Sequence, residues 1–428
     1  MILSAASARR RLLILSATRW LPVGLTFGLT TLIPLQRGIG LAEIGVILSA
    51  QGFVMLALEL PTGGFADTLG RRPVLVLAGL IGAVSATIFL LAHDLWAFVL
   101  ALALQGVFRA LDSGPLESWY VDAALADDPD TAVDQSLSQA ATVLGMAIAG
   151  GALVSGGLIA WHPLPGSALT LPYAVSIVLG AVHVVLTVVL VREPGRDRAG
   201  VAAALATAKA APRVVADGLR TLRSRRVLRT LVLVEVFWSL GMIGFEMLTP
   251  IRLTELVGGE NRAGAIFGLS SAAAWGLFAV GSLLAGLTSR RLGVARTAMI
   301  SRVTNGAFVM LMGLAAGPVG LISAYLLAYL THGAAGPMHA TLLHRQAESG
   351  NRATVLSMNS MIAGGTYSLG LLAVGPLAAH TSTGTAILVT GAFSILGVFT
   401  YLPARREEHE TTTDATNAGR AQLKSAAQ

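Results

Sequence analysis

Twelve apolar stretches of about 20 residues constrain the fold of this chain more than any other feature. A helix of that length crosses the roughly 30 Å hydrocarbon core of a bilayer. Only 12% of the 428 residues are charged, whereas soluble domains carry about 25%. The sequence therefore predicts an all-α, polytopic membrane protein with twelve transmembrane helices. These helices are expected near residues 12–35, 41–63, 73–92, 95–118, 138–160, 170–191, 229–250, 263–287, 296–315, 318–341, 354–379 and 383–403.

Arginine is distributed unevenly over the connections between these stretches. The N-terminal segment and every second connection carry Arg9, Arg10, Arg11, Arg71, Arg72, Arg290, Arg291, Arg296, Arg345, Arg352, Arg405 and Arg406. The opposite connections hold only Arg37, Arg252 and Arg262. Connections rich in Lys and Arg stay on the cytoplasmic side of a membrane. We therefore expect a multi-pass protein of the inner membrane with both termini in the cytoplasm.

The chain also divides into two similar halves. Three short patterns recur about 220 residues apart in the sequence. They are Leu32-Ile33-Pro34-Leu35 with Leu248-Thr249-Pro250-Ile251, Gly63 to Gly70 with Gly286 to Gly293, and Gly114-Pro115 with Gly336-Pro337. The nearly equal spacing predicts a parallel repeat of six helices, with a substrate path between the halves. The expected domains are an N-terminal bundle at 1–191, a basic cytoplasmic linker at 192–228 that touches anionic lipid, a C-terminal bundle at 229–403 and a disordered cytoplasmic tail at 404–428.

A ten-residue motif connects the second and third predicted helices. It reads Gly63-Gly64-Phe65-Ala66-Asp67-Thr68-Leu69-Gly70-Arg71-Arg72. Glycines at 63 and 70 permit a tight turn and a close approach of helices. Asp67 and Arg71 place opposite charges at the membrane edge. The motif resembles the signature loop of the major facilitator superfamily, and that resemblance implies the family's fold.

The resemblance also implies a gate on the cytoplasmic face. In the family, the acid and the arginine of this loop join a charge network that holds the outward-open state, together with an acid at the end of the fourth helix. The gate residues are therefore expected to be Gly63, Asp67, Gly70, Arg71, Arg72 and Asp122, with Glu59 and Glu117 as further members. Thr68 replaces the usual basic residue, and Arg290 stands in place of the acid in the second copy. We therefore expect an asymmetric gate.

Two segments are similar to a subgroup of bacterial drug and metabolite exporters. They are Glu59-Leu60-Pro61-Thr62-Gly63 and Asp112-Ser113-Gly114-Pro115-Leu116-Glu117. The fifth helix is rich in glycine, which resembles the antiporter motif of the superfamily, although Ala152 and Leu153 occupy the place of its Gly-Pro step. This resemblance implies export of a small molecule in exchange for protons.

Charged residues inside the apolar stretches are candidates for the transport machinery, because each costs about 2.5–3.5 kcal/mol at the bilayer centre. Arg19 and Glu235 occupy equivalent places in the first and seventh helices, which in this fold line the central cavity. We expect them to pair when the inner gate closes and to separate when it opens. The alternative is that each side chain extends to nearby lipid headgroups.

Three further helices carry polar stripes at helical spacing. In the seventh helix, Glu235, Trp238, Met242 and Glu246 share one face, which suits protonation coupled to the binding of an apolar or cationic molecule. In the fourth, Gln105, Arg109 and Asp112 share a face, and Arg109 can neutralise Asp112 three residues on. In the tenth, Tyr325, Tyr329, His332 and His339 line up and suit an amphipathic solute. Packing between helices is the alternative for each stripe.

The sequence contains no G-x-x-x-x-G-K-[ST] phosphate loop and no cysteine, so direct use of ATP and thiolate metal sites are excluded. We expect no enzyme activity, no metal, no cofactor and no nucleic-acid partner. The expected function is secondary active transport by a monomer, with proton-coupled efflux of a drug-like or metabolite molecule by alternating access. Proton-coupled uptake of a small nutrient is the alternative, and sodium coupling stays open. The partners are then a small-molecule substrate, protons and membrane lipid.

Overall fold

The computed structural model describes residues 3–62, 65–193, 200–347 and 352–410. This part of the chain consists of helices and short connections, without a β-strand. Twelve helical spans are long and apolar enough to cross a membrane. The predicted number of transmembrane helices and their places along the chain are therefore confirmed.

Six spans form the N-terminal half. They are α1 (Ala5–Thr26) with α2 (Leu29–Gln36), α3 (Leu41–Thr62), α5 (Arg71–Leu91), α6 (Leu95–Asp112) with α7 (Pro115–Asp127), α8 (Val133–Trp161) and α9 (Thr170–Leu190). The short α4 (Phe65–Leu69) lies between α3 and α5. The first span begins seven residues before the predicted start at 12, and the fourth ends nine after the predicted end at 118. Hydropathy marks only the part in hydrocarbon, whereas the helical hydrogen bonds continue into the polar layer.

The other six spans form the C-terminal half. They are α11 (Arg226–Met242) with the π-helix η1 (Ile243–Met247) and α12 (Leu248–Val257), α13 (Glu260–Leu292), α14 (Val294–Leu314), α15 (Pro318–Gln346), α16 (Arg352–His380), and α17 (Thr383–Leu396) with η2 (Gly397–Tyr401). Helix continues from η2 to residue 410, beyond the predicted end at 403. The remainder of the predicted tail, 411–428, lies outside the described residues.

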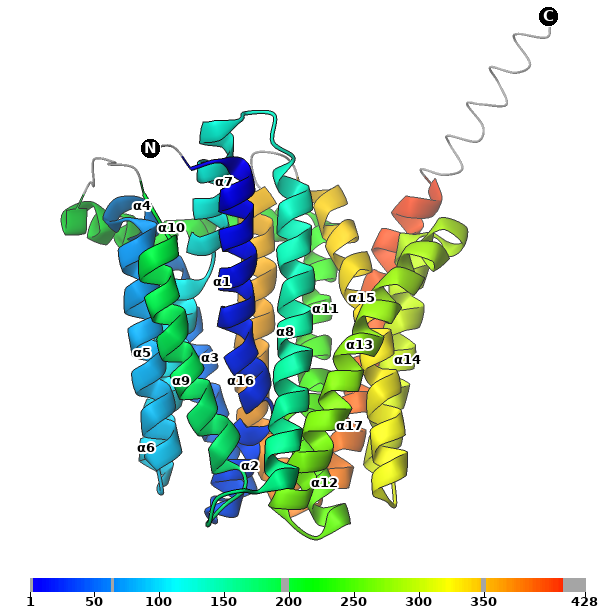
Figure 1. Cartoon of the computed structure of the whole chain (residues 1–428). Coiled ribbons are helices and arrows are strands. Elements are labelled where there is room, and N and C mark those ends of the chain that lie inside the picture. The colour runs from blue at the N-terminus through cyan, green and yellow to red at the C-terminus, as the bar shows by residue number, and fades with distance from the viewer. Residues whose placement is uncertain (1–2, 63–64, 194–199, 348–351, 411–428) are drawn as a thin grey trace, which may run out of the picture.

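The two halves lie side by side as separate bundles (Figure 1). Within each, the helices pack mainly on one another, and the bundles meet mainly through two helix pairs, α3 with α16 and α8 with α13. Glycines permit this approach, since Gly156 of α8 faces Gly268 of α13. The start of α1 and the helix that ends at residue 410 lie at the same end of the molecule, which we call the termini end, and α2 and α12 lie at the opposite end, which we call the outer end.

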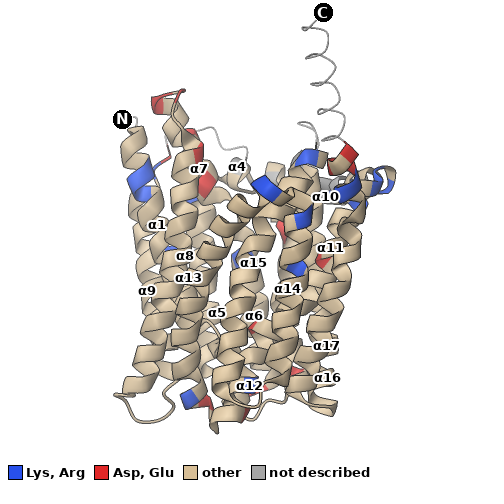
Figure 2. Ribbon diagram, turned by 90° about the vertical axis from the view of Figure 1, so that its right-hand side faces the viewer, with Lys and Arg blue, Asp and Glu red and all other residues tan. Residues whose placement is uncertain are grey.

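The hydrophobic core shows that this structure is closed at one end. At the outer end, one cluster of buried residues joins both halves and includes Leu32, Ile33, Ile251 and Phe267. At the termini end, each half has a core cluster of its own, residues 8–191 in the N-terminal half and 222–404 in the C-terminal half. In the described part of the chain, the cluster of buried residues that both bundles share is thus the one that includes α2 and α12. Most charged residues lie near the two ends of the molecule, and more of them at the termini end (Figure 2).

The repeated Gly-Pro patterns behave differently in the two halves. Gly114 adopts a φ of 93° and separates α6 from α7, a conformation that glycine tolerates best. Its counterpart Gly336 lies within the continuous α15, where Pro337 is an internal residue. The repeated Gly-Pro pair thus interrupts a helix in the N-terminal bundle and lies within an uninterrupted helix in the C-terminal bundle.

The predicted basic linker contains a helix, α10 (Gly200–Ser224), which packs on α3, α4 and α16 at the termini end. Leu222 is buried there, and Gly218 lies against Met358 of α16. Arg196 and Arg198 of the predicted linker lie outside the described residues. The described part of the linker is therefore packed against both bundles rather than extended between them.

Candidate substrate cavity and gates

A cavity of about 230 Å³ lies between the two bundles. Its walls come from α1, α2, α3, α5, α6 and α9 of one half and from η1 and α16 of the other. The polar groups among its lining residues are Arg19, Thr26, Thr30, Thr31, Gln51, Ser85, Gln105, Arg109, Tyr173, Glu246 and Tyr367. Among the residues predicted to line a substrate cavity, Gln105 is part of the lining of this cavity. Thr26, Gln51 and Tyr367 were not singled out, because isolated polar residues within apolar stretches carry little signal.

Arg19 is neutralised within the N-terminal bundle. Its Nε donates to Oδ2 of Asp112 at 2.5 Å, and its guanidinium lies 4.3 Å from the centre of the Phe108 ring. Asp112 is therefore paired with Arg19 of α1 and not with Arg109 of its own helix. In this state Arg19 and Glu235 have different partners, so their pairing is a prediction only for a state in which the termini end is closed.

Arg109 and Glu246 are the two charges left facing the cavity. Arg109 comes from α6 and Glu246 from the π-helix η1, so each belongs to a different bundle. Each influences the other electrostatically. Among the residues that the structure describes, however, neither side chain has a hydrogen bond or an ion pair. A π-helical turn within an α-helix often marks a functional site, and this one carries the acid.

Glu235 lies in a buried polar cluster of the C-terminal bundle, away from this cavity's lining. Its Oε1 is 3.0 Å from Nε2 of His339 and accepts a hydrogen bond from Asn359 at 3.3 Å. His339 also contacts the hydroxyl of Tyr401 through Nδ1 at 3.0 Å. The guanidinium of Arg302, from α14, lies 4.0 Å from the centre of the Trp238 ring. Arg302 was not predicted as a site residue, although it is a charged residue within an apolar stretch.

The predicted aromatic stripe of α15 is part of the bundle core. Tyr325 and Tyr329 are completely buried, and their rings lie 4.9 Å apart. His332 stacks on Trp238 at 4.6 Å, and Met242 packs against the same core. A helical wheel shows which residues share a face, whereas the neighbouring helices decide what that face meets. Here Tyr325, Tyr329 and His332 meet α11, η1 and α13, which is the packing alternative.

The gate region of the N-terminal bundle contains an ion pair and a helix cap. Arg71 donates to Oδ2 of Asp122 at 2.6 Å and to the carbonyl of Ser118 at 2.9 Å. Glu193, which follows α9, accepts the backbone amides of Arg71 at 2.8 Å and Arg72 at 3.3 Å. The first amides of a helix lack partners within the helix, so this carboxylate anchors the start of α5. Gly70 precedes that start with a φ of 96°; Gly63 and the side chain of Asp67 lie outside the described residues.

A glutamate also caps the third helix of the C-terminal bundle, and there it pairs with an arginine. Glu408 accepts the amides of Val294 at 3.0 Å and Ala295 at 2.9 Å, and it pairs with Arg345 at 2.7 Å. Glu193 and Glu408 thus anchor the third helix of each half. Neither was predicted, although Glu193 lies just after the sixth span of its half and Glu408 near the end of the other sixth span, at a spacing close to that of the repeats.

Glu59 and Glu117, which were predicted as gate residues, lie close to the charged residues within the spans. Glu117 lines a second cavity, of about 200 Å³, together with Arg19, Arg109 and Asp112. Glu59 is under the electrostatic influence of Arg109. Both acids are therefore placed around the arginines of α1 and α6.

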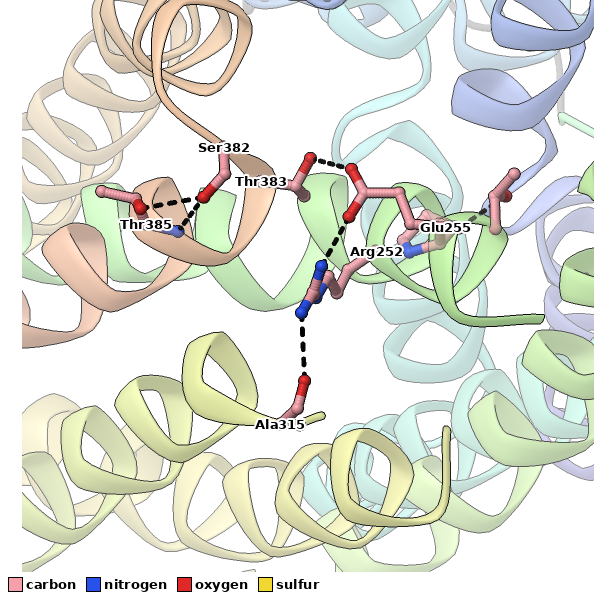
Figure 3. Close-up of polar contacts among 8 residues, drawn as sticks. Arg252, Glu255, Ala315, Ser382, Thr383 and Thr385 are labelled. Carbon is pink, nitrogen blue, oxygen red and sulfur yellow. Dashed lines mark hydrogen bonds and ion pairs between the residues drawn. The ribbon is translucent and has the colours of Figure 1, made fainter. Parts of the chain in front are cut away.

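At the outer end, one arginine in each bundle holds the first helix of its half to the third. Arg252 donates to the carbonyl of Ala315, which ends α14, at 3.1 Å and pairs with Glu255 at 2.8 Å (Figure 3). Thr383 donates to the same carboxylate at 2.5 Å. Arg37 is the counterpart of Arg252 in the N-terminal bundle, and it donates to the carbonyls that end α5, including that of Leu90 at 2.7 Å. The last carbonyls of a helix lack partners within it, so both arginines satisfy groups that burial would otherwise leave unpaired.

Comparison with known proteins finds transport proteins that resemble this chain in sequence or in structure. A segment of 86 residues is 30% identical to the inner membrane transport protein YajR of Escherichia coli (strain K12), and it covers 20% of this chain and 18% of that relative. The solved structure of the nucleoside transporter NupG is 14% identical, covers 92% of this chain and 98% of its own, and superposes with a TM-score of 0.74.

Two further solved structures agree with this fold. A bacterial homologue of the human lysosomal transporter Spinster, in an inward-facing and occupied conformation, is 14% identical over 93% of this chain and 96% of its own, with a TM-score of 0.74. The human organic anion transporter MFSD10 is 18% identical over 92% and 99%, with a TM-score of 0.60. Residues 12–327 match the sequence profile of the Major Facilitator Superfamily. The chain therefore belongs to the Major Facilitator Superfamily.

Proposed function

We propose that this secondary transporter exports a small metabolite in exchange for protons, and that Glu246 binds the proton and the substrate in turn. The observation that carries the proposal is the unpartnered carboxylate of Glu246 in the cavity between the bundles. A carboxylate that has left water is stabilised by a proton, by a cation or by hydrogen bonds. Proton and substrate therefore exclude each other at this side chain, and exclusion of that kind produces exchange.

The arrangement of the bundles supports alternating access to that cavity. The halves share a hydrophobic core at the outer end and have separate cores at the termini end. With the termini in the cytoplasm, this state receives substrate from inside. Transport then requires the shared core to part and the termini end to close. We assign closure to the loop of Asp67, anchored by Arg71, Asp122 and Glu193.

Uptake of a small nutrient together with protons is the second candidate. The polar lining of the cavity favours it, since Gln51, Gln105 and Tyr367 offer more hydrogen-bonding groups than an apolar drug would use. In cotransport Glu246 would hold the proton alone, and these polar groups would bind the solute beside it. The two candidates differ in the direction of proton movement relative to the solute.

A single assay separates the two. The purified protein is reconstituted into vesicles that enclose a pH-sensitive dye, and compact solutes are added outside without an imposed gradient. Exchange for protons makes the lumen more alkaline as solute enters, whereas cotransport makes it more acidic. Glu246→Gln should abolish the pH change, and Glu260→Gln, at the start of α13 and outside the cavity lining, should keep it. A full pH response in Glu246→Gln would refute the proposal.

A further inference from the structure

We infer that the transported molecule is amphoteric: it carries an anionic group that binds Arg109 and a cationic group that binds Glu246. This inference rests on the proposed function, because it takes the cavity between the bundles as the substrate site. Its starting point is the charges that line this cavity. Three charged side chains do so, and Arg19 is neutralised by Asp112. Within this lining one positive and one negative group remain for a ligand, since Glu59 and Glu117, which lie near Arg109, are not part of it.

Arg109 and Glu246 are placed so that a ligand can join them. They come from α6 and η1, on opposite sides of the boundary between the bundles, and no ion pair within 4.0 Å connects them in the described part of the chain. Both line the same cavity of about 230 Å³. Guanidinium recognises a carboxylate or a phosphate with two parallel hydrogen bonds, and a carboxylate accepts hydrogen bonds from an ammonium group.

The site selects an amphoteric solute because a solute of any other charge would leave Arg109, Glu246 or both without a partner. A purely cationic solute would pair with Glu246 and leave Arg109 without a partner when the cavity closes. A purely anionic solute would do the reverse. A site with a buried charged group rejects ligands that fail to pair with it more strongly than it prefers ligands that do. A neutral solute would leave both groups unpaired.

The cavity also limits the size of the solute. Pockets for drug-sized ligands measure about 300–1,000 Å³, so a volume of about 230 Å³ favours a compact molecule such as an amino acid or a small derivative of one. Gln51, Gln105 and Tyr367 can hydrogen-bond its uncharged polar groups. The apolar side chains of Val23, Leu48, Phe27 and Leu102 in the same lining leave room for a hydrocarbon part.

Binding at both charges couples the solute to the movement of the bundles. A ligand held by Arg109 of one half and Glu246 of the other binds best when the halves approach around it, and it therefore favours the closed, occupied state. A proton on Glu246 neutralises only that acid. In the loaded carrier the ligand connects Arg109 with Glu246, whereas in the empty carrier a proton neutralises Glu246 alone.

The test is a binding measurement on the purified full-length protein in lipid nanodiscs, without any proton gradient. The probes are the standard amino acids and, for each that binds, its amide, which lacks the anionic charge, and its N-acetyl derivative, which lacks the cationic charge. We expect the unmodified amino acid to bind about 10- to 150-fold more tightly than either derivative, the range given by one charge-assisted hydrogen bond. Failure of every amino acid to bind, or equal affinity for the derivatives, would overturn the inference.

Variants assign the two charges to the two residues. Arg109→Gln should lower affinity for the amino acid at least about tenfold and leave affinity for its amide unchanged, and Glu246→Gln should do the same with respect to the N-acetyl derivative. Arg262→Gln and Glu260→Gln, outside the cavity lining, should bind like the unmodified protein. Equal losses for all three probes in both cavity variants would show that the pair only holds the bundles together, and would refute the assignment. Arg109→Lys and Glu246→Asp, which keep the charges, provide the same comparison if a glutamine variant fails to fold.

The outcomes separate this inference from the proposed function. Charge-selective binding of an amino acid without any change of lumen pH during transport would leave the substrate class standing and remove the exchange for protons. Proton exchange driven by a purely cationic solute would leave the proposed function standing and overturn the substrate class.

Discussion

Replacing Gly268 with alanine places a methyl group where the backbones of α8 and α13 touch at the outer end. A Cβ at this position would lie 2.6 Å from the backbone nitrogen of Gly156 and 2.7 Å from the carbonyl oxygen of Ala152. Both contacts are with backbone, so no side chain can turn aside to relieve them. The two helices must therefore separate for the variant to fold. Because these helices belong to different bundles, the strain exists only while the outer end is closed.

The size of the effect follows from the cost of overpacking. An added methyl group in a well-packed contact costs roughly 1–3 kcal/mol, and every 1.4 kcal/mol changes an equilibrium constant tenfold. The equilibrium between the closed and open outer end should therefore shift about 5- to 150-fold toward opening. The variant should retain its fold, since the packing inside each bundle is unchanged.

The chain has no cysteine, so no native cysteine has to be removed before cysteines are introduced for spin labels. His93→Cys and Ala316→Cys place labels on exposed connections at the outer ends of the two bundles. Pulsed dipolar spectroscopy should show a larger population of long distances in Gly268→Ala. Gly276→Ala, in the same helix but with nothing within 4 Å of the added Cβ, is the matched control. An unchanged distance distribution in Gly268→Ala, or an equal change in both variants, would refute this account of the outer contact.

Three further predictions concern groups that the structure assigns to stability. Glu235→Leu leaves the side chains of His339 and Asn359 without their acceptor and should destabilise the protein by about 1–3 kcal/mol; the isosteric Glu235→Gln should cost clearly less, as thermal unfolding will show. Arg252→Ala leaves the carbonyl of Ala315 unsatisfied and should cost about 1–3 kcal/mol, so an unaltered unfolding temperature would contradict this role. Glu193→Ala removes the cap of α5 and should cost about 0.5–2 kcal/mol, with faster hydrogen exchange confined to the first turn of that helix.

Much of the fold follows from local properties of the chain. Each span is an uninterrupted apolar stretch of helical length, and in lipid the backbone groups of such a stretch must be satisfied within the helix. The boundaries at Leu41, Leu95, Thr170 and Pro318 agree with prediction because sharp changes in hydropathy mark them. The repeat of the two halves is also readable in the sequence. These features depend on composition over short segments, and no distant partner can change them.

The partners of the charged residues could be identified only in the tertiary structure. The sequence singled out Arg19, Arg109, Asp112, Glu235 and Glu246, because charge is rare in apolar stretches. It could not show that Asp112 turns to Arg19, that Glu235 lies with His339, or that Arg109 and Glu246 are left facing one cavity. These relations depend on how helices about 100 residues or more apart rotate and pack against each other. A helical wheel defines a face, and only the neighbouring helix decides whether that face is core, ion pair or cavity.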